Sequence, residues 1–352
     1  MKKVIIFLLI ISIHSLGNIN NSNSLSNKEI IYVETPEEYK ESADNGDQIA
    51  QYRLGMLYNR EKNYELAEKY LKLTADNNDI QGQYQLGILY KKQNKNKLAE
   101  KYFKLAADNG EIFAQLELGH FYKNEKKYTL AEKYYLIAMK NGNINAQQYL
   151  GILHIELGDE KSGENNLKLA ADKGSTDAQI RIGNIYLKQK NYNLAEKYYK
   201  MGISKENVIS YYNLGILYTE LKKINLAEKY YKISADRGYT KAQFNLGILY
   251  DKQNKNALAE KYYILAAKKG NIGAQNNLGI IYMRTRKNTL AEKYFKMAIE
   301  KDYELAYFNL GLLYESQKKL KEAEKYFEIA SKKGNKKATE SLKKLKEKKD
   351  SI

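Results

Sequence analysis

Four asparagines spaced 32 residues apart offer the most regular recognition chemistry in the chain: Asn213, Asn245, Asn277 and Asn309. A side-chain amide carries both hydrogen-bond donors and an acceptor. A row of amides at equal intervals could therefore hold the backbone of an extended peptide regardless of the peptide's side chains. The alternative is that each asparagine binds a neighbouring helix, and the sequence leaves both interpretations open.

Apolar side chains accompany this row. Tyr212, Phe244 and Phe308 directly precede three of the asparagines, and each has an Ile or Leu four residues later. At about 100° per residue these positions share a helix face. The stripe predicts either the apolar floor of a peptide-binding groove or packing against the first helix of the next repeat.

The residues needed for catalysis or metal binding are missing from the rest of the chain. There is no Cys, and beyond residue 17 the histidines are His120 and His154, which do not occupy matching repeat positions. Repeated acids such as Glu68, Glu100 and Glu132 stand beside lysines, and we expect them on a solvated face where nothing raises a carboxyl pKa. The sequence therefore predicts no catalytic, cofactor-binding or metal-binding residues, and a protein that is not an enzyme.

These candidates belong to a strict internal repeat. Glycine recurs every 32 residues at nine positions from Gly55 to Gly311, usually after Leu, with Tyr three residues later and Ala twelve residues later. In each repeat, apolar residues spaced three and four apart predict two helices separated by a polar turn. Gly163 replaces one of the helix-interior alanines, which predicts a local bend in the fourth repeat.

One such helix pair cannot be stable alone. Fixing the backbone of 32 residues costs about 30–60 kcal/mol, whereas a pair buries only a few large side chains at about 1.5–3 kcal/mol each. Stacking lets each pair bury both flanks. Between repeats, seven glycines and Asn78 stand where a helix end needs positive φ: Gly46, Gly110, Gly142, Gly174, Gly238, Gly270 and Gly334.

The repeat columns resemble the tetratricopeptide repeat family at Leu54-Gly55, Tyr58, Ala67 and Leu71. The connector from Ala106 to Gly110, leading to Ala114-Gln115, is similar to the Sel-one-like subfamily. The resemblance implies an all-α, right-handed α-solenoid of nine 32-residue helix-turn-helix repeats. We place the repeats at residues 47–337, with capping helices at 34–46 and 338–352. The N-terminal cap begins with Thr35, Pro36 and a capping-box Glu.

The same resemblance implies a function. Such proteins are non-catalytic scaffolds whose concave face, lined by the first helices, holds a partner protein or an extended peptide. The asparagine row resembles the asparagine ladder in the repeat domain of O-linked N-acetylglucosamine transferase. The candidate peptide-binding residues are thus Asn213, Asn245, Asn277, Asn309, Tyr212, Phe244 and Phe308.

Net charge supports an alternative function. The chain has 59 Lys and Arg against 42 Asp and Glu, a net charge of +17, and residues 332–350 hold nine Lys against three acids. This balance favours a cationic adaptor that binds an anionic envelope polymer or a membrane surface. We do not expect nucleic acid as a partner, because most tyrosines recur in core columns.

The first residues predict export from a bacterial cell. Lys2 and Lys3 precede an uncharged run from Val4 to Ile13, and Ser15-Leu16-Gly17 supplies small residues for cleavage. The run is too short to cross a bilayer. We expect a signal peptide at 1–17, a flexible leader at 18–33, and a periplasmic or extracellular protein without a transmembrane span in the mature chain.

Overall fold

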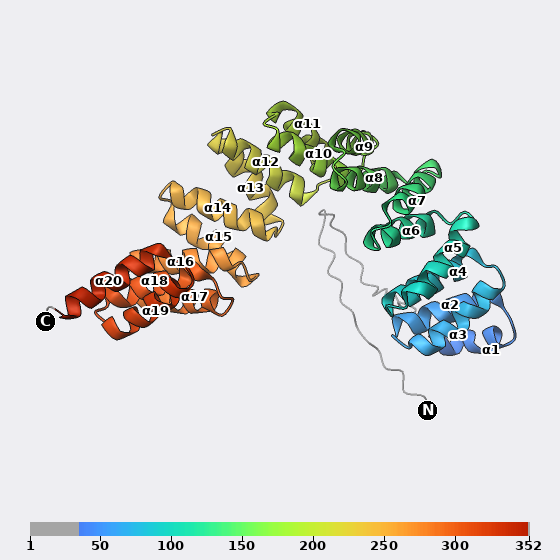
Figure 1. Ribbon diagram of the computed structural model, residues 1–352, viewed down its shortest axis with the longest axis horizontal. Helices are drawn as coiled ribbons and strands as arrows, with labels where there is room; N and C mark the ends of the chain where they lie inside the picture. The colour runs from blue at the N-terminus through green and yellow to red at the C-terminus, as the bar shows by residue number, and fades with distance from the viewer. Residues whose placement is uncertain (1–34, 351–352) are drawn as a thin grey trace, which may run out of the picture. The chain divides into compact units, whose positions relative to one another are not determined.

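The structure is a computed structural model that describes residues 35–350, and the side chains of 35–347. The predicted signal peptide at 1–17 and leader at 18–33 lie outside the described residues. All 20 regular elements within the described range are α-helices, and no strand occurs there (Figure 1). The prediction of an all-α repeat fold with a helix at each end is confirmed.

Most helices have 13 residues, and their bounds repeat with the period of the sequence. They are α1 (Pro36–Asp44), α2 (Gln48–Arg60), α3 (Tyr64–Asp76), α4 (Ile80–Lys92), α5 (Asn96–Asp108), α6 (Ile112–Asn124), α7 (Tyr128–Lys140), α8 (Ile144–Glu156), α9 (Glu160–Asp172), α10 (Thr176–Lys188), α11 (Tyr192–Ile203), α12 (Val208–Glu220), α13 (Ile224–Asp236), α14 (Thr240–Lys252), α15 (Asn256–Lys268), α16 (Ile272–Arg284), α17 (Asn288–Ile299), α18 (Glu304–Ser316), α19 (Leu320–Lys332) and α20 (Lys336–Asp350). We call the first helix of each repeat its A helix (α2, α4 and so on to α18) and the second its B helix (α3 to α19).

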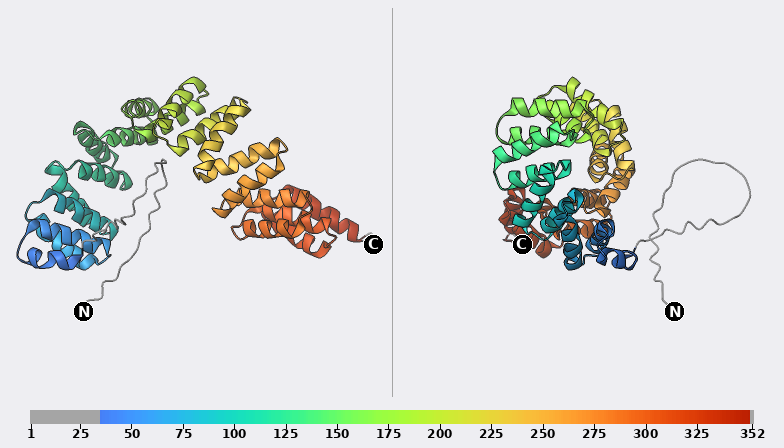
Figure 2. Two further views of the ribbon diagram at one scale, coloured as in Figure 1. Left: turned by 180° about the vertical axis from the view of Figure 1, so that it is seen from behind. Right: turned by 90° about the vertical axis from the view of Figure 1, so that its right-hand side faces the viewer.

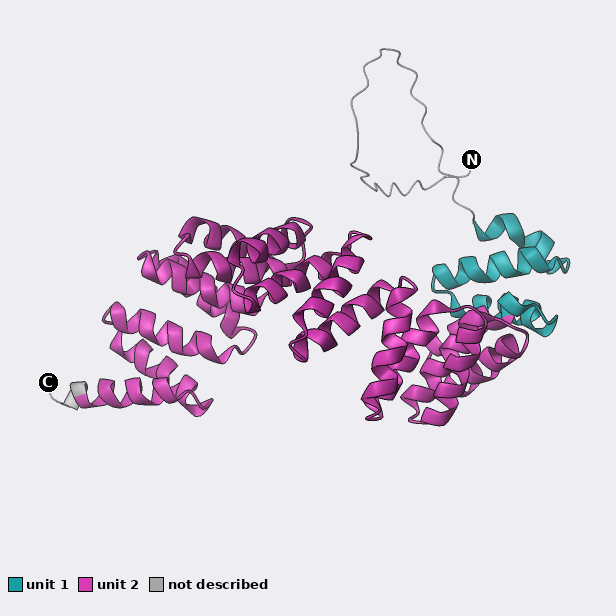
Figure 3. Cartoon of the chain, turned by 90° about the horizontal axis from the view of Figure 1, so that it is seen from above, with its two compact units in different colours: residues 1–82 teal, residues 83–352 magenta. Residues whose placement is uncertain are grey.

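The chain divides into two compact units, residues 1–82 and 83–352 (Figure 3). In the first unit, α1 packs on α2 and α2 on α3, and the Tyr70 hydroxyl donates a hydrogen bond of 2.8 Å to Asp44. In the second unit each helix from α5 to α19 packs on the next one in the chain, and A helices of some successive repeats also touch, as α14 and α16 do. Figure 2 shows the helices of this unit from two further sides.

The repeated glycine lets the two helices of a repeat approach closely. Gly247 of α14 faces Tyr263 of α15, and a Cβ atom at Gly247 would lie 2.5 Å from the tyrosine ring. Ala259, twelve residues after this glycine, is fully buried. The Leu-Gly and Ala columns are therefore close-packing positions, which explains why small residues occupy them.

Both kinds of turn end a helix with a left-handed residue. Between repeats the predicted glycines have φ values of 80° to 96°, and Asn78 has φ 60°, as expected from the sequence. The turn from A helix to B helix has the same geometry, although lysine occupies it in several repeats, as in Lys222 with φ 57°. Only Gly158 supplies glycine at that position among the described repeats.

The helices at the ends differ slightly from the prediction. Pro36 occupies the first turn of α1 and Thr35 has extended backbone, but the Thr35 side chain makes no capping hydrogen bond with any described residue. The C-terminal helix α20 begins at Lys336 and buries Ala338 and Leu345, while its other described faces are largely exposed and Lys-rich.

Gly163, from which the sequence predicted a bend, has a packing role in the structure. Helix α9 runs unbroken from Glu160 to Asp172. A Cβ atom at Gly163 would lie 2.4 Å from the Ile155 side chain and 2.8 Å from the Gly151 carbonyl oxygen. Gly163 thus accommodates the bulky Ile155 across the α8–α9 contact.

Candidate functional site

The four asparagines of the candidate site lie at the same position of four successive A helices, α12, α14, α16 and α18. Each amide nitrogen donates a hydrogen bond to the repeat before it. The acceptors are Asn184 Oδ1 for Asn213 (3.2 Å), the Tyr212 hydroxyl for Asn245 (3.4 Å), the Tyr263 hydroxyl for Asn277 (3.1 Å) and Asn276 Oδ1 for Asn309 (2.8 Å). The sequence had left packing and ligand binding as alternatives, and the amide nitrogens serve packing.

The asparagine oxygens are placed differently. No described residue donates a hydrogen bond to the Oδ1 atoms of Asn213, Asn245 or Asn309. Asn277 Oδ1 accepts a long bond of 3.4 Å from Asn276. In the sequence-based hypothesis, both the nitrogen and the oxygen of each amide could bind a peptide. In the structure the nitrogens are bonded within the protein, so the row offers mainly oxygen acceptors.

The tyrosine hydroxyls that accept from this row stay protonated. Burial raises the pKa of Tyr263 to about 12, against the lowering effect of the hydrogen bond from Asn277. Burial likewise raises the pKa of Tyr212, which receives the bond from Asn245. The anchors of the asparagines are therefore neutral over the physiological pH range.

The aromatic residues beside the row are half-buried. The Phe244 ring lies 6.0 Å from that of Tyr263, and Phe308 lies 5.8 Å from Phe327, so both pack on the B helix of their own repeat. Phe244 also approaches the next A helix, since a Cβ atom at Gly273 would lie 2.8 Å from its ring.

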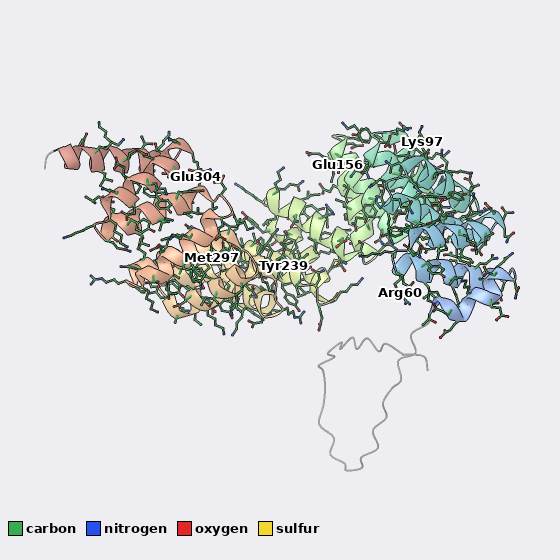
Figure 4. All side chains as sticks on the ribbon, turned by 90° about the horizontal axis from the view of Figure 1, so that it is seen from below. Arg60, Lys97, Glu156, Tyr239, Met297 and Glu304 are labelled. Carbon is green, nitrogen blue, oxygen red and sulfur yellow. The ribbon has the colours of Figure 1, made fainter. Side chains whose placement is uncertain are left out.

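Tyr212 likewise packs on the B helix of its own repeat and on the start of the next repeat. Its ring lies 5.9 Å from Tyr231 of the B helix and 5.1 Å from Tyr239, the residue before α14 that is labelled in Figure 4. Of the two interpretations of this stripe, packing accounts for part of each side chain. A partly exposed edge remains on Tyr212, Phe244 and Phe308.

The repeated glutamates are not on a freely solvated face, which corrects the sequence-based interpretation. Glu100 has 24% of its side chain exposed, and it accepts a hydrogen bond of 2.6 Å from Tyr122 of the following repeat as well as an ion pair of 2.7 Å from Lys104. Burial by itself would raise the pKa of Glu100, but the hydrogen bonds from Lys104 and Tyr122, together with nearby lysine charges, lower it below its ordinary value. These glutamates join repeats and carry no sign of acid–base chemistry.

The same bond recurs through the second unit. It joins Tyr218 to Glu196, Tyr250 to Glu228, Tyr282 to Glu260 and Tyr314 to Glu292. In the fourth repeat His154 replaces the tyrosine, and its Nε2 lies 3.2 Å from Glu132. The signal for this contact was available in the sequence as a constant spacing of 22 residues between the Glu and Tyr columns.

Other kinds of site find little support in the part of the chain that the structure describes. No group of three or more His, Cys, Asp or Glu side chains could hold a metal ion among these residues. None of the described helices combines the length and the apolar character needed to cross a bilayer.

Comparison with known families decides the classification. Tetratricopeptide repeat models match residues 80–108, 176–204, 208–232 and 276–337, and a Sel1 repeat model matches residues 48–79 and 240–271. Together these matches cover more than half of the chain. The chain belongs to the tetratricopeptide and Sel1 repeat family. A comparison with curated protein sequences gave no match.

Solved Sel1 repeat proteins have a similar fold. The protective antigen c5321 of uropathogenic Escherichia coli is 24% identical with a TM-score of 0.59, over 89% of this chain and 82% of that one. A Sel1 repeat protein of Oxalobacter formigenes is 21% identical with a TM-score of 0.62, over 77% of this chain and 88% of that one. Repeat solenoids of this family are generally non-catalytic and commonly serve as protein-interaction scaffolds.

Proposed function

We propose that the chain is a non-catalytic scaffold that binds an extended peptide, or an extended segment of a partner protein, along the A helices α12, α14, α16 and α18. The observation that carries this proposal is the row of asparagine oxygens on those helices. Asn245 and Asn309 are partly exposed, and each has an acceptor oxygen that no described residue uses, whereas the unused oxygen of Asn213 belongs to a residue that is only 6% exposed. A peptide backbone supplies one N–H donor at nearly every residue, so the ligand's sequence matters little to this contact.

The anchoring of the amides supports recognition by the oxygens. Because each nitrogen is bonded to the preceding repeat, as Asn309 is to Asn276 at 2.8 Å, the side chain is already fixed before a ligand arrives. Groups that need no further ordering lose less conformational entropy on binding. The acceptor oxygens of the row are therefore held in place before a ligand binds.

The repeat spacing fits an extended chain. Packed helices lie about 8–10 Å apart, and α14 touches α16 while α16 touches α18. A peptide in the extended polyproline II conformation advances about 3.1 Å per residue, and its N–H groups face the same side every third residue. We therefore expect successive asparagines to accept from peptide N–H groups three residues apart, so that four repeats engage about ten residues.

The aromatic stripe supplies the second part of the binding surface. Partly exposed edges of Tyr212, Phe244 and Phe308 lie one residue before the asparagines. Apolar peptide side chains between the bonded N–H groups would cover these edges. Such contacts gain affinity from burial and depend little on salt.

A peptide selection tests this proposal. We would select peptides from a random 12-residue display library on the full chain, and then measure binding of the enriched peptides at two salt concentrations. We expect N245A/N277A to lose most of the affinity, with little salt dependence in the wild-type binding. The matched control is Q85A/R181A, which changes the same repeat position in two A helices outside the proposed surface.

Several results would reject peptide binding on this surface. Failure to enrich peptides is one, and equal affinity of wild type and N245A/N277A is another. A steep fall of peptide affinity with salt would point to the positive charge of the chain as the binding determinant instead.

A further inference from the structure

The turns between A and B helices gather on one edge of the stack formed by α14 to α20. Arg284, at the end of α16, pairs with Asp251, near the end of α14, at 2.5 Å. The opposite turns meet in the same way, since Lys333 after α19 pairs with Asp302 after α17 at 2.6 Å. Equivalent turns of successive repeats are therefore neighbours, on two separate edges.

The two edges carry different charge. The three A-to-B turns at residues 252–257, 284–289 and 316–321 contain eight Lys and Arg and no Asp or Glu. The opposite turns at residues 236–241, 268–273 and 300–305 contain five Lys and Arg and four Asp and Glu. Positive charge is thus concentrated on the first edge.

The C-terminal helix extends this positive edge. Helix α20 packs on α19 and buries Ala338, the counterpart of an A-helix alanine. Lys346 donates to Glu328 at 3.4 Å, from the position that tyrosine holds in the repeats. Since A helices end at the A-to-B turns, Lys343, Lys344 and Lys346 lie toward the same edge. We call residues 252–257, 284–289 and 316–321, with these three lysines, the basic edge.

Most charges of the basic edge remain open to a partner. Arg286, Lys318 and Lys321 are exposed and form no ion pair with any described residue. Lys287 and Lys319 lie 5.6 Å above the rings of Tyr282 and Tyr314 and form no ion pair with any described residue, although the charge of Lys319 helps to lower the pKa of Glu292.

The acids near the basic edge are few. Asp251 is bound by Arg284, Glu228 lies 3.9 Å from Lys255, and Lys343 pairs with Glu347. Glu315 and Glu322 flank the last turn and are exposed. The excess of basic side chains over these acids leaves the edge positive.

Apolar side chains project beside the basic turns. Leu258 and Leu290, which directly follow two of the turns, are 39% and 38% exposed. A hydrated polyanion would gain little from them, whereas the interface of a bilayer accommodates both lysine and leucine. We propose that the basic edge docks the protein on an anionic lipid membrane, with its cations at the lipid phosphates and these leucines at the acyl boundary. This surface is separate from the proposed peptide site.

Vesicle binding by the full chain tests the proposal. We would measure co-sedimentation with vesicles of phosphatidylglycerol and phosphatidylcholine, with pure phosphatidylcholine for comparison. We expect binding only to the anionic vesicles, weakened by salt. R286Q/K287Q/K318Q/K319Q should lower the partition constant by about a hundredfold, because each cation contributes separately near an anionic leaflet.

The matched control removes four charges elsewhere. K140Q/K241Q/K268Q/K301Q changes three exposed lysines of the opposite turns and Lys140, which ends α7 before an equivalent turn earlier in the chain. None of the four forms an ion pair with a described residue. This variant should lose only the binding that four charges contribute at long range, to within about threefold. Equal loss in both variants would mean that net charge, without a specific edge, causes binding, and would overturn the proposal. So would the absence of binding to anionic vesicles.

A further pair of measurements separates lipid from a soluble polyanion. L258S/L290S should weaken vesicle binding but leave binding of inorganic polyphosphate unchanged. If this variant binds vesicles as the wild type does, while polyphosphate binds equally tightly, the edge recognises polyanions and the membrane proposal fails. R286Q/K287Q/K318Q/K319Q should bind the selected peptides as the wild type does, which would show that its loss of vesicle binding is independent of the peptide site.

Discussion

Tyr282 donates its hydroxyl hydrogen to Glu260 at 2.7 Å, and this bond joins α16 to the B helix of the preceding repeat, α15. The same tyrosine ring stacks on Tyr294 of its own repeat at 5.6 Å. One residue thus connects the helices within a repeat and the repeats to each other. Because stability in such a stack depends on neighbour interfaces, this bond is a suitable place to test the stacking.

We expect Tyr282→Phe to lower the free energy of unfolding by about 1–2 kcal/mol, because a hydrogen bond to a partly buried carboxylate is lost while the ring remains. Urea denaturation followed by circular dichroism measures the change. Tyr128→Phe is the control, since the exposed Tyr128 makes no side-chain hydrogen bond with described residues. An equal effect in both variants would contradict the assigned role of Glu260.

Glycine in the Leu-Gly column is predicted to be irreplaceable for reasons of space. Gly247→Ala would place a Cβ atom 2.5 Å from Tyr263 and should destabilise the protein by about 1–3 kcal/mol through overpacking. The cost should fall in a Tyr263→Leu background, where the side chain is smaller. A double-mutant cycle measures this coupling, and additive effects would show that the contact does not set the requirement.

Replacing a lysine that has positive φ by glycine should stabilise the protein. Lys222 has φ 57°. Lys222→Gly should relieve strain of about 1–2 kcal/mol against a backbone entropy cost of about 0.5–1 kcal/mol. We expect a small gain in the free energy of unfolding. In contrast, Lys232→Gly, within α13, should lower it by about 1 kcal/mol. Thermal unfolding of both variants tests the difference in sign.

Acid should weaken the contacts between repeats. The hydrogen bond from Lys296 is the main cause that lowers the pKa of Glu292 below its ordinary value of 4.5. A carboxyl with a lowered folded-state pKa stabilises the fold above 4.5, and this contribution is lost as pH falls through the lower value. Glu292→Gln should therefore show a smaller loss of stability between pH 5 and pH 3 than the wild type, measured by urea midpoints. Parallel pH curves would refute the contribution of Glu292.

Helix positions followed from the sequence because the apolar period is local and repeats nine times without a gap. Contacts between repeats were harder to predict. Glu100 stands four residues before Lys104, which is the pattern of a solvated helix face, and only the docking of Tyr122 from the next repeat half-buries it. The left-handed backbone at Lys222 could not be predicted from the residue type, since Gly, Asn and Asp favour that conformation more strongly than Lys does.

The orientation of the asparagine amides was also beyond the sequence. Their four acceptors are of two chemical kinds, asparagine oxygens for Asn213 and Asn309 and tyrosine hydroxyls for Asn245 and Asn277. These acceptors stand at several different repeat positions, so no single column in the sequence marks them. The asparagines therefore recur at one repeat position, whereas the residues that accept hydrogen bonds from them do not.

A backbone scan of a bound peptide tests the central claim most directly. Each N–H of a selected peptide would be replaced in turn by N-methyl, and the dissociation constant measured for each variant by calorimetry. If the asparagine row accepts from the backbone of a peptide in the polyproline II conformation, affinity should fall at about every third position, and this pattern should fade in N245A/N277A. Uniform losses along the peptide, or the same periodic pattern in both proteins, would contradict recognition by the asparagine oxygens.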